Sequence, residues 1–200
     1  GNFAVNSVNH INADKVHAHG IKGKGIKVGI IDTGVDFTHK MLGGNGDVAA
    51  YNEMDKAKST PLFPNQKVVG GYDFAGTDYS PVALTPDWRI PRPDVNPVDE
   101  GGHGTHVAGS VAGIGDGINT YDGVAPEADL YALKVFGNNG GTSDTVVIAA
   151  MEWAMDPNQD LDPSDRLDVL NLSLGGAYGK PNILYALAVK NLAKAGIISV

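Results

Sequence analysis

The residues best suited to chemistry in this chain are two histidines in the segment EGGHGTHVAGSVAG, residues 100–113. His103 and His106 stand three residues apart, so on a helix they would occupy neighbouring positions of one face. That spacing is compatible with a metal site, although the familiar zinc-hydrolase helix has its histidines four residues apart with a glutamate between them. Alternatively, His103 begins the helix as a general base while His106 packs or hydrogen-bonds inside the protein. Two purely structural histidines are the third interpretation.

A carboxylate that could pair with a histidine follows the apolar run 26–31. This run predicts a strand buried on both faces, and Asp32 stands at its carboxyl end. Sites in open α/β sheets gather at the carboxyl ends of strands, where a carboxylate withdrawn from water must be paired to stay ionised. Small residues after His106 would let the helix lie close to the sheet and bring His103 against Asp32. Otherwise, Asp32 only caps a turn.

The elements that must position these residues alternate along the chain. Strands are predicted at 26–31, 67–74, 128–136, 167–174 and 196–200. Helices are predicted at 12–19, 103–114, 144–155 (capped at Thr142 or Ser143) and from Pro181 to about residue 195. Five prolines keep 76–102 irregular. The order predicts an α/β fold: a doubly wound, mostly parallel sheet with helices on both faces.

Composition excludes several classes of function. The chain of 200 residues has a net charge of −8 and no basic stripe, which argues against a nucleic-acid partner. It contains no cysteine, so disulfides and thiolate sites are excluded. No apolar run has the length of a membrane span. The apolar segment 196–200 predicts a buried strand at which a domain would not stop. We therefore expect residues 1–200 to be the N-terminal portion of a single domain.

The segments VGIIDTGVD, GGHGTHVAGSVAG, GVAPEADLYALKVFG and LNLSLGG, in this order and spacing, resemble those of subtilisin-like serine proteases, the subtilases. The resemblance extends over about 12–200, and the Pro-rich loop is similar to that of large extracellular members with a protease-associated insert. It implies that Asp32 is the aspartate and His103 the general base of an Asp-His-Ser triad, with His106 non-catalytic. It also implies two substrate-binding strands, formed by Gly140 and Gly141 and by Ser173, Leu174 and Gly175.

The nucleophile of such a triad is missing from this chain. One G-T-S occurs at 141–143, but Asp144 and Thr145 stand where the family has Met and Ala, so Ser143 is not expected to be the nucleophile. The resemblance places the nucleophilic serine and an oxyanion asparagine in a C-terminal part of the same peptidase. Together with the peptide substrate, that part is an expected partner. A secreted endopeptidase is implied, with this chain inactive alone. The alternative is a non-catalytic subtilase-like module that binds peptides or a partner chain.

The resemblance implies no cofactor for the chemistry, although calcium is possible as a structural ion. Met41 stands where many subtilases have a calcium-binding aspartate, and IGDGINTYDG replaces the usual calcium loop. A weaker candidate is DPNQDLDPSD, which lacks the glycine and glutamate of an EF-hand loop. Its candidate ligands are Asp156, Asn158, Asp160 and Asp162.

Overall fold

The computed structural model describes residues 7–115, 121–176 and 183–200. Their strands form one parallel sheet in the spatial order β2-β3-β1-β4-β5. The prediction of an α/β fold with a parallel sheet is confirmed. The strands are β1 (Lys27–Asp32), β2 (Val68–Asp73), β3 (Asp129–Lys134), β4 (Val169–Asn171) and β5 (Ile198–Ser199).

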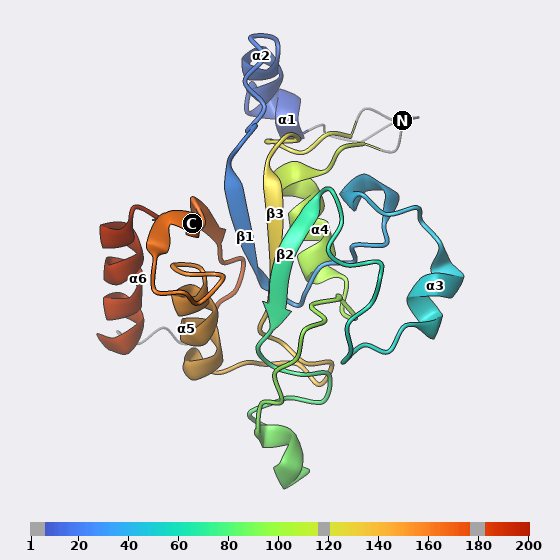
Figure 1. Ribbon diagram of the computed structural model, residues 1–200, viewed down its shortest axis with the longest axis vertical. Helices are drawn as coiled ribbons and strands as arrows, with labels where there is room; N and C mark the ends of the chain where they lie inside the picture. Colours follow the sequence, from blue (N-terminus) through green and yellow to red (C-terminus); the bar gives the residue numbers. More distant parts are fainter. Residues whose placement is uncertain (1–6, 116–120, 177–182) are drawn as a thin grey trace.

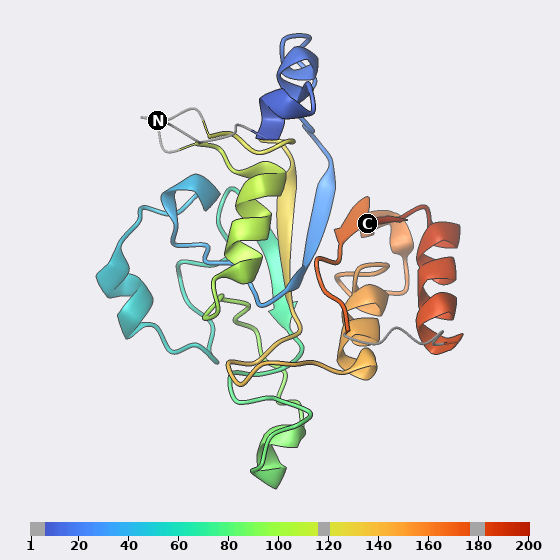
Figure 2. The ribbon, with the colours of Figure 1, turned by 180° about the vertical axis from the view of Figure 1, so that it is seen from behind.

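Helices cover both faces of this sheet. Figures 1 and 2 show α4 against one face and α5 and α6 on the other side of the molecule. No helix in the described part of the chain is both long and apolar enough to cross a membrane. The α-helices are α1 (Ser7–His10), α2 (Ala13–His17), α3 (Val48–Glu53), α4 (His103–Ala112), α5 (Asp144–Trp153) and α6 (Ile183–Ala195), and short 3₁₀ helices span Lys40–Leu42, Pro86–Arg89 and Pro163–Asp165.

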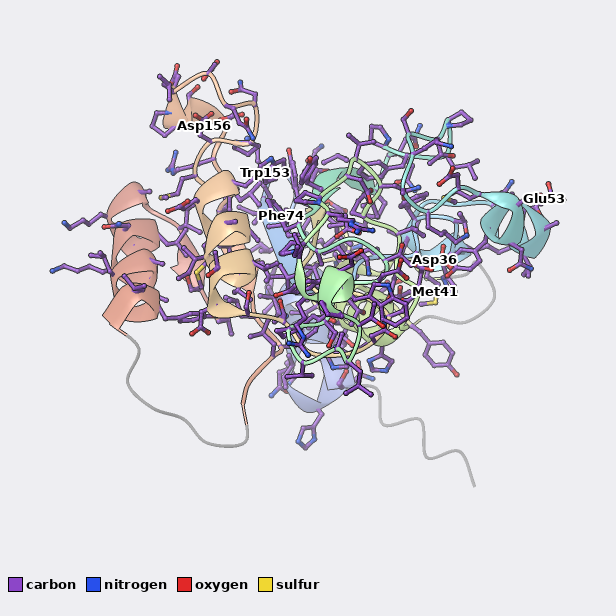
Figure 3. The ribbon with its side chains drawn as sticks, turned by 90° about the horizontal axis from the view of Figure 1, so that it is seen from below. Asp36, Met41, Glu53, Phe74, Trp153 and Asp156 are labelled. Atoms are coloured by element: carbon purple, nitrogen blue, oxygen red, sulfur yellow. The ribbon has the colours of Figure 1, made fainter. Side chains whose placement is uncertain are left out.

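The core is divided by the sheet into two layers because side chains alternate along each strand. On β1, Ile30 packs with Ala108 of α4 in one apolar cluster. Ile31 packs in the other cluster with Met151 of α5. Phe74, directly after β2, meets Trp153 of α5 edge-on with ring centroids 6.4 Å apart (Figure 3). Asp32, at an even position like Ile30, therefore emerges on the α4 side.

Several predicted elements differ from the structure at their ends. Of the predicted helix at 12–19, the structure keeps α2 (Ala13–His17), which follows a left-handed Asn12 at φ 61°; α1, before it, was not predicted. The strand predicted at 167–174 keeps only the three residues of β4. The last strand is found as β5, which pairs with β4, and its Ile198 is 63% exposed in the described part of the chain. Pro181 lies outside the described residues.

Candidate active site

The structure brings Asp32 and His103 into direct contact at the carboxyl end of β1. His103 Nδ1 lies 2.7 Å from Asp32 Oδ1 and 2.9 Å from Oδ2. The Asp32 side chain is 1% exposed, whereas that of His103 is 60% exposed. In the described part of the chain, the recorded hydrogen bonds of the imidazole are these two at Nδ1. A buried carboxylate thus holds one nitrogen of a ring that remains open to solvent.

This contact depends on a close approach between α4 and β1. His103 is the first residue of α4, and Gly102 before it is left-handed at φ 87°. A Cβ on Gly104 would lie 2.1 Å from the Gly34 carbonyl oxygen and 3.1 Å from Asp32 Cβ. Only glycine fits at position 104, and this lets the first turn of α4 rest on the end of β1.

A second buried aspartate, Asp99, fixes the first turn of α4. Its Oδ1 accepts hydrogen bonds from the Gly101 and Gly102 N–H groups, and its Oδ2 accepts from both the N–H and the hydroxyl of Thr105. The Thr33 hydroxyl donates to Asp99 Oδ1 at 2.8 Å. Asp99 therefore joins the turn after β1 to the N-terminus of α4. The sequence analysis did not identify this residue. Its position four residues before His103 could have indicated an aspartate that binds N–H groups at the start of the helix.

The two aspartates have defined effects on titration at the site. The hydrogen bond and the negative charge of Asp32 raise the pKa of His103 above its ordinary value. Burial of Asp99 alone would raise its pKa. Hydrogen bonds from Thr105, Gly102 and Thr33 outweigh that burial, and the pKa of Asp99 lies below its ordinary value. The site therefore combines an ionised structural carboxylate with an imidazole of increased basicity.

The residues predicted to bind substrate lie beyond the strands that flank β1. Gly140 follows β3 and lines a cavity of about 240 Å³ together with Thr33, Glu100 and Phe136. Gly140 and Gly141 have φ of 71° and 78°, so this segment is a left-handed turn here and not the extended strand that was expected. On the other flank, Ser173, Leu174 and Gly175 follow β4, and Ser173 accepts a hydrogen bond from Asn171.

Ser143 is placed at the N-terminus of α5. Its hydroxyl lies 2.9 Å from that of Tyr79. It occupies the N-cap position of α5, one of the two positions predicted for the cap, but its side chain makes no capping hydrogen bond. The Thr142 hydroxyl donates instead to the Val135 carbonyl. The Thr142 hydroxyl is thus engaged within the β3–α5 connection, and the Ser143 hydroxyl with Tyr79 of the segment after β2.

His106 does not share the surroundings of His103. The expectation that it packs inside the protein was wrong, because its side chain is exposed on α4. It lines a separate cavity of about 440 Å³ with His39, Met41 and Tyr121. Among the described residues, no group of three His, Cys, Asp or Glu side chains is arranged to hold a metal ion.

In the acidic segment after α5, residues 156–165, polar side chains form hydrogen bonds with other residues of the same loop. Asp156 accepts hydrogen bonds from the N–H groups of Asp160 and Leu161. Asp162 accepts from the N–H of Ser164, and Asn158 donates to Asp160. Figure 3 shows Asp156 in a loop projecting beyond α5, far from Asp36 and Met41. The segment that replaces the usual calcium loop lies partly outside the described residues.

The molecule is thus an α/β protein with a carboxylate–imidazole pair at the carboxyl edge of its parallel sheet, the edge at which such folds place their functional sites. The chain belongs to the subtilase family, whose model matches residues 23–200. This confirms the resemblance inferred from its motifs.

Three similar proteins align with nearly the whole chain. It is 35% identical to Subtilisin DY of Bacillus licheniformis over 193 residues, 93% of this chain and 52% of the relative. It is 36% identical to the Minor extracellular protease Vpr of Bacillus subtilis over 195 residues, 97% of this chain and 19% of the relative. A Thermostable alkaline protease of Halalkalibacterium halodurans is 31% identical over 193 residues, 96% of this chain and 39% of the relative. The chain thus spans about half or less of the length of these relatives.

Proposed function

We propose that this chain forms the Asp- and His-bearing part of a secreted serine endopeptidase. The observation that carries the proposal is the contact of buried Asp32 with Nδ1 of exposed His103. The relatives that support it include subtilisins and a protease named as extracellular. The chemistry of this pair requires only side chains and no cofactor.

The pair would work by proton transfer. Asp32 accepts the Nδ1–H of His103, which fixes the tautomer whose Nε2 carries the lone pair. Nε2 then takes the proton of an attacking serine hydroxyl and returns it to the leaving amine. Asp32 stabilises the imidazolium that exists between these two steps. The same interaction raises the pKa of His103, which makes the imidazole a better base.

We propose that the nucleophile comes from outside these 200 residues and that the peptide lies between the segments after β3 and β4. Ser143 is the serine of the chain's one G-T-S motif, and its hydroxyl is held by Tyr79. Gly140 and Ser173 would stand on opposite sides of the peptide, since β3 and β4 flank β1. The chain alone would then lack both a nucleophile and a side-chain oxyanion donor.

The test is titration with a fluorophosphonate that labels activated serines. We expect no stoichiometric labelling of the isolated chain. We expect labelling of the longer protein that contains it, and loss of that labelling in His103→Ala. Stoichiometric labelling of the isolated chain would contradict the missing nucleophile. A longer protein that binds peptides but takes no label would be the non-catalytic module.

A further inference from the structure

Three buried charged side chains form one row across the carboxyl edge of the sheet. Lys134, the last residue of β3, is the register partner of Asp32 on β1 and of Asp73 on β2. The exposed fractions are 1% for Asp32, 2% for Lys134 and 0% for Asp73. Register partners on parallel strands share a face, so all three emerge on the α4 side. The charges of Asp32, Lys134 and Asp73 along this row are negative, positive and negative.

The ammonium of Lys134 binds two backbone carbonyls. Nζ donates to the Thr33 oxygen at 3.0 Å and to the Phe136 oxygen at 2.6 Å. The ion pairs recorded among the described residues join Lys58 to Asp55 and His103 to Asp32, so Lys134 makes no direct salt bridge there. A buried cation is costly unless its charge is compensated. The two carbonyl dipoles and the flanking carboxylates supply that compensation.

One of these two carbonyls belongs to Thr33, the residue directly after Asp32. The Thr33 N–H donates to Asp32 Oδ1 at 2.7 Å, the same oxygen that His103 contacts. The Thr33 hydroxyl also accepts from the Gly104 N–H on α4. Lys134 therefore restrains the peptide that orients Asp32, and through it the first turn of α4.

We propose that Lys134 is a positioning residue for the Asp32–His103 pair. It acts by holding the Thr33 peptide, whose N–H donates to Asp32 Oδ1. This inference rests on the proposed function, because it concerns the same site. If Lys134 had only a structural role, replacing it would affect His103 no more than replacing another buried lysine would.

The chain supplies a matched control for that comparison. Lys67, one residue before β2, is 6% exposed, and its Nζ donates to the carbonyls of Pro126 and Ala128 at 2.7 and 2.6 Å. It thus repeats the burial and hydrogen bonding of Lys134, but near the opposite end of the sheet. Replacing either lysine by methionine removes a buried charge and two hydrogen bonds. Only one of the two changes lies beside Asp32.

The experiment compares Lys134→Met with Lys67→Met in the longer protein that contains this chain, at a temperature where both are folded. His103 is titrated by NMR, and kcat and KM are measured on a peptide. In Lys134→Met we expect the His103 pKa to fall toward its ordinary value near 6.5. We expect kcat to fall about ten- to a hundred-fold with KM within about twofold. In Lys67→Met the His103 pKa and kcat should match the parent.

Equal His103 pKa and kcat values in the two methionine variants would overturn the proposal. So would a rise of the His103 pKa in Lys134→Met, since Lys134 would then act only as a neighbouring charge. The titration needs no turnover, so it decides the inference even if the protein proves inactive. Should Lys134→Met not fold, Lys134→Arg is measured. Its bulkier guanidinium should shift Thr33 and lower kcat at least several-fold, whereas parental kcat with an unmoved His103 pKa would overturn the proposal.

Discussion

At the scale of single residues, the site joins two side chains of opposite exposure. Asp32 is 1% exposed and His103 is 60% exposed, so the carboxylate is fixed by its surroundings while the imidazole reaches solvent. The pKa of His103 is raised by the hydrogen bond and the charge of Asp32. Removing the carboxylate should therefore change both the titration and the tautomer of the ring.

We predict that Asp32→Asn lowers the His103 pKa and, in the longer protein, reduces kcat about 10⁴-fold, because the amide no longer fixes the productive tautomer. NMR titration of His103 and steady-state kinetics check this. The control is His106→Ala, which alters an exposed histidine of the same helix and should leave the His103 titration unchanged. A His103 pKa that is the same in Asp32→Asn and the parent would contradict the assigned pairing.

The raised pKa also fixes the sign of two pH dependences. Stabilisation from protonated His103 beside Asp32 is fully present below the unfolded pKa of histidine, near 6.5, and is lost as pH rises through the higher folded pKa. The proposed catalysis requires the neutral ring, so kcat/KM of the longer protein should rise with pH over the same interval. A pH–rate profile with its lower midpoint below 6.5 would contradict a raised pKa for this base.

At the scale of elements, the position of His103 depends on how α4 begins. Asp99 accepts four hydrogen bonds from Gly101, Gly102 and Thr105, and a fifth from Thr33. Its pKa is lowered overall, so its contribution to stability is present above the unfolded pKa of aspartate and is lost as pH falls through the folded pKa. This buried carboxylate replaces an ordinary helix cap.

We predict that Asp99→Ala lowers the free energy of unfolding by about 2–4 kcal/mol and brings the His103 pKa closer to its ordinary value, because the first turn of α4 loosens. Urea unfolding and NMR titration measure the two effects. Asp47→Ala is the control, since Asp47 caps the exposed helix α3 through the N–H groups of Ala49 and Ala50. It should cost about 1 kcal/mol and leave His103 unchanged. Equal effects of the two substitutions on His103 would contradict this role.

The close approach of α4 to β1 gives a prediction with two glycines of one helix. A Cβ at position 104 would strike the Gly34 carbonyl at 2.1 Å, whereas a Cβ at Gly109 meets nothing within 4 Å. Gly104→Ala should destabilise the fold by more than about 2 kcal/mol and abolish the His103 pKa shift. Gly109→Ala should stabilise it by about 0.5–1 kcal/mol, because alanine is the better helix former. Thermal unfolding distinguishes them, and a neutral Gly104→Ala would contradict the tight contact.

At the scale of the whole molecule, buried charge gathers at one end of the sheet. Burial raises the pKa of Asp73 to about 6, against the opposing effects of the Gly76 N–H, the charge of Lys134 and the Ala75 N–H. One of its oxygens, Oδ2, is buried without a hydrogen-bond partner among the described residues. For a carboxyl group with a raised pKa, stability is fully present below the unfolded pKa and is lost as pH rises through about 6.

We predict that this loss amounts to about 2 kcal/mol between pH 4 and pH 7 and is absent in Asp73→Asn. The difference in the free energy of unfolding between Asp73→Asn and the parent should thus shift in favour of the variant as pH rises. Urea unfolding across this range measures it. Glu53→Gln, at an exposed carboxyl group of α3, should instead follow the parent. Parallel curves for Asp73→Asn and the parent would contradict the raised pKa.

The sequence predicted the parallel sheet, the order of its elements, and Asp32 and His103 as neighbours. These depend on apolar periodicity and on residue types at strand and helix ends, which one chain displays directly. It did not predict Asp99 or Lys134, because a buried charged residue in a loop or strand looks like a surface residue until its partners are known.

The alternation along β1 has a practical consequence for directed evolution. Ile31 contributes to the layer that contains α5 and α6, while Asp32 beside it serves the opposite layer. In the proposed peptidase, substitutions around Met151 or Leu192 should therefore alter heat resistance with little change in catalytic rate. Substitutions around Ala108 should change both properties together. A search for thermostable variants can begin in the α5 and α6 layer and leave the α4 layer for a search for altered activity.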